Sequence, residues 1–339
     1  GATFKGYENF YVQELEIKAK IIRYIRARWQ LPNGNVVTED VPDEHKNNHF
    51  GPELRSYIVA QVHQNRVPQD KIKQQLNDFG IDISSGQINK ILVETAQQLS
   101  AERKDILEEG KKSESVHVDD TGSRNDGVNG FCTTVCNDFF TYLESSDSKS
   151  RINLLKILSG KENPGYIFNE DAFKYLRLCK ATQDAYDWSM QYNNTSHAKE
   201  EFEALINSRT FSATSKRFIT EACLMAYCIA NGLPADLIIV SDDAPQFDLK
   251  IIQHALCWVH AERGLKKIIP KNCEEAADLK KILDLIWMFY GELKDYKKNP
   301  SEEKKKYLSD RFDTIMSTKT SGHQIAPALK ALIDNKKKL

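Results

Sequence analysis

The chain has 339 residues, of which 40% are hydrophobic and 28% charged, a composition ordinary for a globular protein of two or three domains. No apolar run approaches the length of a membrane span and no charged-then-apolar signal segment opens the chain, so we expect no membrane role. Seven cysteines without a Cys-x-x-Cys pair indicate a reducing cytosol. The formal net charge of −1 requires any surface that binds nucleic acid to be local.

The sequence predicts that residues 1–50 form an N-terminal segment and a linker. Within it, residues 11–29 combine apolar and basic side chains, a pattern that predicts either a strand entering a helix or one amphipathic helix. The basic side chains form either a solvated face or a contact to phosphate. A break rich in Pro, Gly and Asn at residues 31–35 predicts a connection between domains.

Residues 51–110 predict an all-α region. Its second helix runs from about residue 68 to residue 79 and ends at Gly80, and Ser84 or Ser85 can cap a third helix. This is a helix-turn-helix layout, in which the start of the last helix reaches base edges in the major groove. A plain three-helix bundle is the alternative, since this spacing is easily met by chance. The predicted DNA-contacting residues are Ser85, Gln87, Asn89 and Lys90.

Two apolar segments each run into a pair of carboxylates. VHVDDTG at residues 116–122 delivers Asp119 and Asp120 to a turn predicted at Thr121-Gly122, and LIIVSDDA at residues 237–244 delivers Asp242 and Asp243. Two strands that end in carboxylates predict a shared metal site. Mg²⁺ or Mn²⁺ prefers such oxygen ligands and keeps positions for phosphate oxygens and water. The chemistry this indicates is phosphoryl transfer on nucleic acid.

The order of elements after Asp119 predicts an α/β fold. Two strands, 131–136 and 139–143, are joined by a hairpin turn at Asn137-Asp138 and followed by a helix from about Ser148. This order matches the start of a ribonuclease-H-like mixed sheet, whose first and fourth strands are neighbours. Asp119 and Asp242, 242 − 119 = 123 residues apart, would then meet at one edge. We expect this core over residues 111–270, with a helical insertion near 180–233.

CWVHAER at residues 257–263 contains a Cys-x-x-His pair. A zinc site would need two further ligands, and neither Cys273 nor His254 stands in a standard spacing for it. The pattern therefore favours a buried Cys257 and a His260 that orients near the active site or a phosphate.

Several separated motifs together resemble one family. VDDTG, SDSKSRINLLKIL, SDDAPQF and HALCWVHAER, with LPNG, FGPELRSYI and FGIDISSGQINKIL before them, are similar to the DDE-type transposases of bacterial insertion sequences, in the branch with a Cys-x-x-His signature after the second Asp. The resemblance covers roughly residues 4–269. It implies that Asp119 and Asp242 are catalytic acids that bind Mg²⁺ or Mn²⁺, with Asp120 and Asp243 as supporting neighbours or alternative ligands. The implied mechanism is a two-metal displacement at a phosphodiester.

The family pattern also requires a third acid, a Glu on a helix. No such motif precedes Leu339, and Glu262 is the candidate that could stand in. Residues 271–339 read as a Lys-rich helical insertion that the chain cuts short. We therefore expect a transposase that binds double-stranded DNA at mobile-element ends as a homo-oligomer, in the bacterial cytoplasm at the nucleoid. The alternatives are a catalytically inactive transposase-derived DNA-binding protein or regulator, and a structure-dependent nuclease on the same fold.

Overall fold

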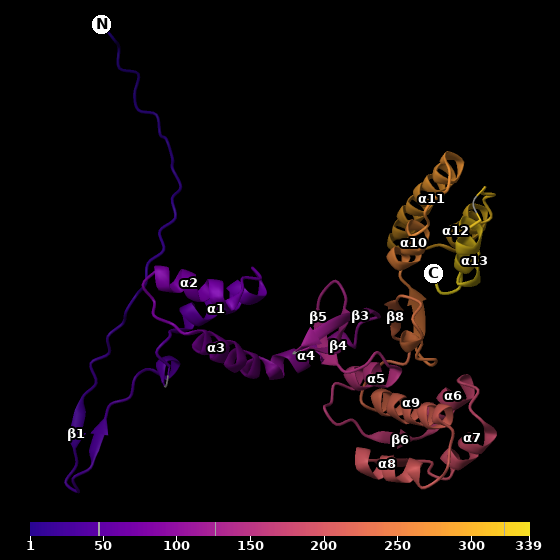
Figure 1. Cartoon of the computed structure of the whole chain (residues 1–339), viewed down its shortest axis with the longest axis horizontal. Coiled ribbons are helices and arrows are strands. Elements are labelled where there is room, and N and C mark those ends of the chain that lie inside the picture. Colours follow the sequence, from indigo (N-terminus) through magenta and orange to yellow (C-terminus); the bar gives the residue numbers. More distant parts are fainter. Residues whose placement is uncertain (47, 126, 322) are drawn as a thin grey trace. The chain divides into compact units, whose positions relative to one another are not determined.

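The computed structural model describes residues 1–46, 48–125, 127–321 and 323–339 (Figure 1). The chain packs into two compact units, residues 1–101 and 102–339. Both helices and strands contribute, so the fold is mixed α/β. Within the described ranges, no helix combines the length and apolarity that crossing a membrane requires.

The first 27 residues form neither helix nor strand, so the helix predicted over residues 11–29 is wrong. Their apolar side chains, such as Leu15 and Ile21, lie 85% and 92% exposed. An amphipathic helix gains most of its stability by packing its apolar face, and here that face has no surface to pack on within the described part of this unit. The break at residues 31–35 is also not a connection between domains. It is the turn of a hairpin between β1 (Arg28–Gln30) and β2 (Val36–Thr38).

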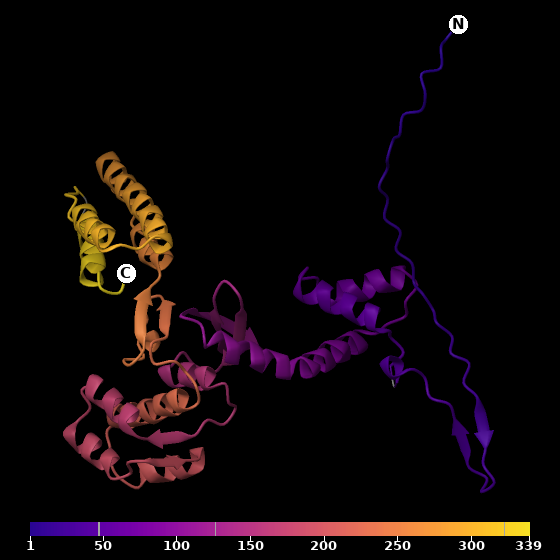
Figure 2. The same cartoon turned by 180° about the vertical axis from the view of Figure 1, so that it is seen from behind.

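Three helices, α1 (Pro52–His63), α2 (Gln69–Asp78) and α3 (Ser85–Gln98), enclose a small apolar core; Figure 2 shows them from behind. Gly80 ends α2 with a φ of 83°, a left-handed conformation that favours glycine. The Ser84 hydroxyl accepts a hydrogen bond from the Gln87 amide and caps α3, as the sequence predicts. The buried core residues are Ile58, Ile72, Leu76, Ile83, Ile88 and Ile91. Helix α4 (Ser100–Gly110) follows.

A five-stranded mixed sheet is the centre of the second unit. Its order is β5 (Thr141–Ser146), β4 (Val128–Cys136), β3 (Ser115–Asn125), β8 (Ile238–Ser241), β9 (Gln253–Leu256). The β3–β4 and β4–β5 pairs are antiparallel, and the β3–β8 and β8–β9 pairs are parallel. The first and fourth strands of this sheet are neighbours, an arrangement consistent with a ribonuclease-H-like core.

Strand β3 is longer than its apolar residues indicate. The predicted turn at Thr121-Gly122 is wrong, because β3 pairs with β4 without interruption from His117 opposite Cys136 to Asn125 opposite Val128. Asp119 and Asp120 therefore lie inside a strand and not at its end. The partner strand supplies backbone hydrogen bonds that stabilise extended structure through polar sequence.

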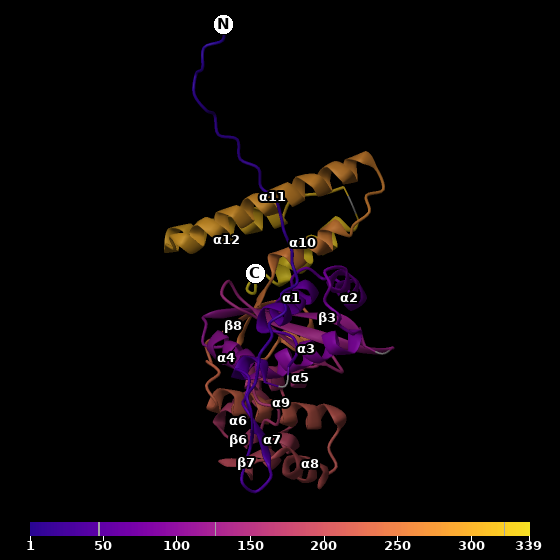
Figure 3. The same ribbon diagram turned by 90° about the vertical axis from the view of Figure 1, so that its left-hand side faces the viewer.

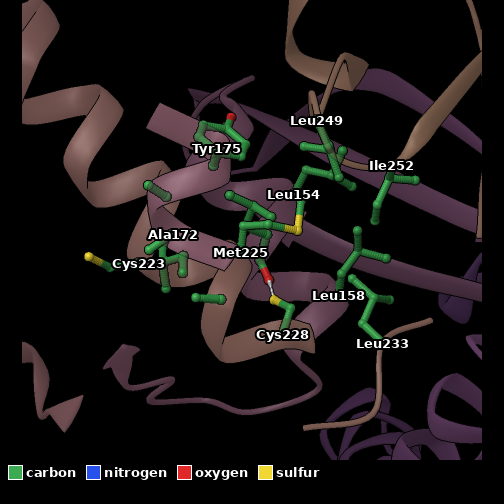
Figure 4. Packing of buried hydrophobic residues seen from close by; sticks show 14 of the residues in the cluster. Leu154, Leu158, Ala172, Tyr175, Cys223, Met225, Cys228, Leu233, Leu249 and Ile252 are labelled. Atoms are coloured by element: carbon green, nitrogen blue, oxygen red, sulfur yellow. Dashed lines mark hydrogen bonds between the residues drawn. The ribbon is translucent and has the colours of Figure 1, made fainter. Parts of the chain in front are cut away.

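Helices cover one face of the sheet. α5 (Arg151–Ser159) and α9 (Ala213–Ala230) share a core with Val116 and Val118 of β3 and Ile239 of β8. Figure 4 shows part of this packing, where the Cys228 thiol of α9 donates to the backbone oxygen of Leu155 at 3.2 Å. The surrounding elements are α6 (Glu170–Leu178), α7 (Gln183–Met190), α8 (Lys199–Asn207) and a two-stranded sheet of β6 (Tyr166–Phe168) and β7 (Thr195–His197).

The last four helices have an apolar core of their own. They are α10 (Trp258–Lys266), α11 (Cys273–Lys298), α12 (Glu302–Met316) and α13 (Ile325–Asp334). Ile282, Phe289 and Phe312 are among the buried residues where α11 and α12 pack together (Figure 3). On α11 the buried Leu279, Ile282, Ile286 and Phe289 are spaced three or four positions apart, which builds the apolar stripe that this helix buries.

Candidate active site

The register of the sheet relates the positions of the two predicted acids. In the β3–β8 ladder, Ser115 lies opposite Ile238 and His117 opposite Val240, so each β3 residue faces the residue 123 positions later. Asp119 and Asp242 have this same separation. The paired residues end at His117 and Val240, and Asp242 lies one residue beyond the end of β8, so continuing the register by two residues would bring Asp119 level with Asp242.

Strand alternation directs Asp119 to the sheet face opposite α5 and α9. Val116 and Val118 are buried against these helices, whereas His117 and Asp119 are exposed. Successive side chains of a strand point to opposite faces, and partners in register share a face. Asp242 would share the face of Asp119 if the register continued past the end of β8.

Both carboxylates are available for a cation. One oxygen of Asp119 accepts the Asp120 amide at 2.8 Å, and one oxygen of Asp242 accepts the Ala244 amide at 3.0 Å. Neither carboxylate forms an ion pair with a Lys, Arg or His of the described ranges. Burial, followed by the negative charge of Asp119, raises the pKa of the neighbouring Cys136 thiol. The face is therefore electronegative and has carboxylate oxygens to spare.

Asp120 and Asp243, the second acids of the two Asp-Asp pairs, have polar partners of their own. Asp120 points to the helix-covered face, where its Oδ1 accepts from the Thr133 hydroxyl at 2.6 Å and its Oδ2 accepts from the Gln246 amide at 3.2 Å. Asp243 is exposed, and its Oδ2 accepts from Asn335 at 3.3 Å. Both are therefore occupied by polar partners outside the Asp119–Asp242 face.

Cys257 lies next to the end of β8, the strand that precedes Asp242, and His260 follows it on α10. The Cys257 amide donates to the Ser241 carbonyl at 2.7 Å, which links the start of α10 to the end of β8. His260 lies one turn further along α10, and its buried Nδ1 has no hydrogen-bond partner in the described part of the chain. Ser241 is itself buried and hydrogen-bonded to His254 at 2.8 Å. Burial is the main cause that lowers the pKa of His254.

Glu262, the candidate third acid, lies on α10 with 2% of its surface exposed. Its Oε1 accepts from the Trp287 indole of α11 at 2.9 Å and pairs with Lys266 at 2.6 Å. Among the described residues, no polar contact joins Glu262 to Asp119 or Asp242. The structure therefore shows Glu262 within the C-terminal group of helices, and its catalytic role stays a prediction.

Sequence reasoning missed the residues that hold these segments together. Gln246 stands in the SDDAPQF motif, of which only the carboxylates were predicted to be functional. Arg151 stands in the SDSKSRINLLKIL motif, of which only the apolar residues were assigned to a helix. Arg151 donates to the Pro245 carbonyl at 2.6 Å and to buried Glu221 at 2.8 Å. Burial disfavours the charged guanidinium, but Tyr175 and Glu221 outweigh it and raise the pKa of Arg151. Local sequence has no signal for such long-range partners.

The donor set fits a hard divalent cation. Asp119 and Asp242 offer carboxylate oxygens, which are the ligands that Mg²⁺ and Mn²⁺ prefer, and one or two carboxylates suffice for Mg²⁺ when phosphate and water complete its shell. Throughout residues 1–46, 48–125, 127–321 and 323–339, no group of three or more His, Cys, Asp or Glu side chains is placed to hold a metal. The candidate centre therefore consists of two protein carboxylates.

The predicted DNA-contacting residues occupy the first half of α3. Ser85, Asn89 and Lys90 are exposed, and Gln87 is half-buried behind the Ser84 cap. The ammonium of Lys90 lies 3.7 Å from the Glu94 carboxylate one turn later, a weak surface pair. These side chains are thus accessible for contacts to a ligand.

Comparisons with known proteins identify the family of the chain. Residues 47–234 match the model of a family described as "Transposase IS66 family", a range that includes Asp119 and all of β3, β4 and β5. The chain is also 32% identical, over 231 residues, to the uncharacterized protein y4jO of Sinorhizobium fredii. That alignment covers 66% of this chain and 69% of the relative. The chain therefore belongs to the IS66 family of DDE transposases.

Proposed function

We propose that the protein binds DNA at the ends of a mobile element and catalyses cleavage and transfer of DNA strands, with Asp119 and Asp242 as the ligands of Mg²⁺ or Mn²⁺. The observation that supports this proposal is the β3–β8 register, whose continuation past the end of β8 would bring these two carboxylates level on one face of the sheet. Family membership supports the reaction class.

The chain's own contribution is to hold two carboxylates where a phosphodiester can reach them. A bound divalent ion would activate a water or 3′-hydroxyl and stabilise the leaving oxygen. Asp119 and Asp242 each accept one backbone amide hydrogen bond, which holds the orientation of the carboxylate. The Cys257 amide holds the end of β8 beside Asp242, and we assign His260 of α10 a supporting role.

DNA binding is assigned to residues 51–110. The packing of α1, α2 and α3 supports a helix-turn-helix region, because the exposed first half of α3 presents polar side chains that can reach base edges. The remaining organisation proposed is a linker over residues 1–50, a catalytic core over 111–270 with its helical insertion, and a helical insertion over 271–339. Two protomers acting on two DNA ends, in the bacterial cytoplasm at the nucleoid, complete the proposal.

The test combines DNA cleavage with matched variants. The protein is incubated with Mg²⁺ or Mn²⁺ and linear DNA that carries the element ends, and the products are resolved by strand on denaturing gels. We expect metal-dependent nicks at the ends and joined products with wild type, and neither product with Asp119→Ala or Asp242→Ala. Asp243→Ala is the matched control and should retain activity, since Asp243 contacts Asn335 instead of the shared face. Equal products from wild type and the Asp119→Ala/Asp242→Ala double variant would show that the acids are misassigned.

DNA binding is measured separately. Because Lys and Arg displace counterions from phosphates, the logarithm of the binding constant should fall linearly with the logarithm of salt concentration. Lys90→Ala and Gln87→Ala should weaken binding to element ends. If both variants bind like wild type, α3 is not the reading helix, and Arg23, Arg26 and Arg28 become the candidates.

One observation favours a second function, that of a catalytically inactive DNA-binding regulator. The carboxylate of Glu262 is engaged by Trp287 and Lys266, so the structure offers no third acid at the Asp119–Asp242 pair within the described ranges. End binding with wild-type affinity, together with an absence of nicks in either metal, would support this function over the first.

A further inference from the structure

The loop that carries Asp242 is held at both ends of its short helical turn. We define the Asp242 loop as residues 242–247. The Ala244 amide donates to the Asp242 carboxylate at 3.0 Å, and the Phe247 amide donates to the Ala244 carbonyl at 3.1 Å. Phe247 is 1% exposed and belongs to the core beneath the sheet. The loop is therefore a compact turn whose far end is anchored in the core.

Gln246 connects this loop to the strand that carries Asp119. Its amide nitrogen donates to Asp120 Oδ2 at 3.2 Å, while Asp120 Oδ1 accepts from Thr133 of β4 at 2.6 Å. Lys149 adds a contact at 3.2 Å to the Asp120 carbonyl. This hydrogen bond thus joins Asp120, the residue after Asp119, to Gln246, which lies four positions after Asp242.

Arg151 holds the same loop from the start of α5. One guanidinium nitrogen donates to the Pro245 carbonyl at 2.6 Å and the other to Glu221 at 2.8 Å. Glu221 is 1% exposed and also accepts from the Tyr175 hydroxyl at 3.0 Å. A guanidinium bound to a buried carboxylate, which is itself held by a phenol, has little freedom, so it fixes the Pro245 carbonyl that it binds.

We propose that Asp120, Gln246 and Arg151 are positioning residues that clasp the Asp242 loop to β3 and so fix Asp242 opposite Asp119. This inference rests on the proposed function, because it assumes that these two carboxylates bind the divalent ion. It assigns Asp120 to the support of the site and excludes it as an alternative ligand. Residues that orient metal-binding carboxylates typically change metal affinity about 10- to 100-fold when removed.

The clasp is tested on the full chain by two measurements that need no catalysis. Titration with Mn²⁺, followed by the electron paramagnetic resonance signal of free Mn²⁺, gives the metal affinity. Hydrogen exchange read by mass spectrometry reports the opening of peptides that contain residues 242–247. Gln246→Ala and Arg151→Lys are the main variants. A lysine keeps the charge beside Glu221 but cannot reach Glu221 and the Pro245 carbonyl together. Gln253→Ala, an exposed glutamine on β9, is the matched control.

We expect Gln246→Ala and Arg151→Lys to weaken Mn²⁺ binding about 10- to 100-fold and to speed exchange in the loop, while the control matches wild type. Asp120→Ala should do the same. Asp120→Asn should restore affinity, because a carboxamide can still hydrogen-bond to Gln246 and Thr133. A double variant Asp120→Ala/Gln246→Ala should cost no more than the larger single change, since both remove one contact.

The outcomes separate the clasp from the proposed function. If Asp119→Ala leaves Mn²⁺ affinity unchanged, the metal assignment of the proposed function fails. If Asp119→Ala abolishes binding while Gln246→Ala and Arg151→Lys behave like wild type in both measurements, the clasp is wrong. Loss of affinity in Asp120→Asn equal to that in Asp120→Ala would make Asp120 a ligand and would also overturn the inference.

Discussion

Replacing Glu221 by alanine should destabilise the second unit strongly. The Glu221 carboxylate is 1% exposed and accepts hydrogen bonds from Arg151 at 2.8 Å and from the Tyr175 hydroxyl at 3.0 Å. Burial, aided by the charge of Glu221, raises the pKa of Tyr175, so the phenol is a neutral donor that needs this acceptor. The variant leaves a mostly buried guanidinium without its counter-charge and a buried hydroxyl without its acceptor.

The expected loss of unfolding free energy follows from removing one partner of a buried ion pair. Removing one partner of such a pair typically costs about 3–5 kcal/mol, because the other charge stays buried and uncompensated. With a urea dependence of about 2 kcal/mol per molar, the unfolding midpoint should fall by about 2 M. Glu221→Gln should cost less, since the amide oxygen still accepts from Tyr175 and the volume is kept.

Equilibrium urea unfolding, followed by tryptophan fluorescence and circular dichroism, measures the change. Arg217→Ala is the control. Arg217 lies 3.6 Å from the same carboxylate, but its side chain is 54% exposed, so its loss should cost under about 1 kcal/mol. If Glu221→Ala costs no more than Arg217→Ala, the buried network does not stabilise the fold and the reasoning is refuted.

Three further predictions follow from caps and titrating groups. Ser84→Ala removes the α3 cap and should lower the unfolding free energy of the first unit by about 1 kcal/mol in thermal unfolding, whereas exposed Ser85→Ala should not. Burial raises the pKa of Cys228 to about 12, so iodoacetamide at pH 8.5 should label exposed Cys273 and spare Cys228 until the chain unfolds; equal labelling of the native protein would contradict this. Burial opposes a lowered pKa of Asp248, but Lys250 outweighs burial and lowers it. The stability that the ionised Asp248 contributes is therefore present above about pH 3.8 and is lost as the pH falls below that value. The unfolding free energy of Asp248→Asn should consequently depend less steeply on pH below about 3.8 than that of wild type.

Local signals in the sequence located many elements correctly. Ser84 and Gly80 mark the ends of α3 and α2, because capping and left-handed backbone depend on the residue and its immediate neighbours. The hairpin turn at Asn137-Asp138 lies between β4 and β5 for the same reason. Family membership was also recognisable from separated motifs, and the comparisons confirm it.

Signals that need a partner were misread. Residues 11–29 have enough apolar side chains for a helix, yet the structure leaves residues up to 27 without one, because a helix is stabilised by the surface on which it packs. Thr121 and Gly122 look like a turn, yet β4 keeps them extended through backbone pairing. Local preference is weak against such long-range hydrogen bonds.

The VDDTG motif by itself determined that two carboxylates follow apolar residues of a strand, and the 123-residue spacing to SDDA suggested their partner. Only the tertiary structure decided where these side chains point. Strand alternation turns Asp119 to the open face and Asp120 to the helix-covered face, and continuing the β3–β8 register would bring Asp242 level with Asp119. The physical reason is that side chains alternate with a period of two, so neighbours in sequence face different surroundings, which only the pairing of distant strands defines.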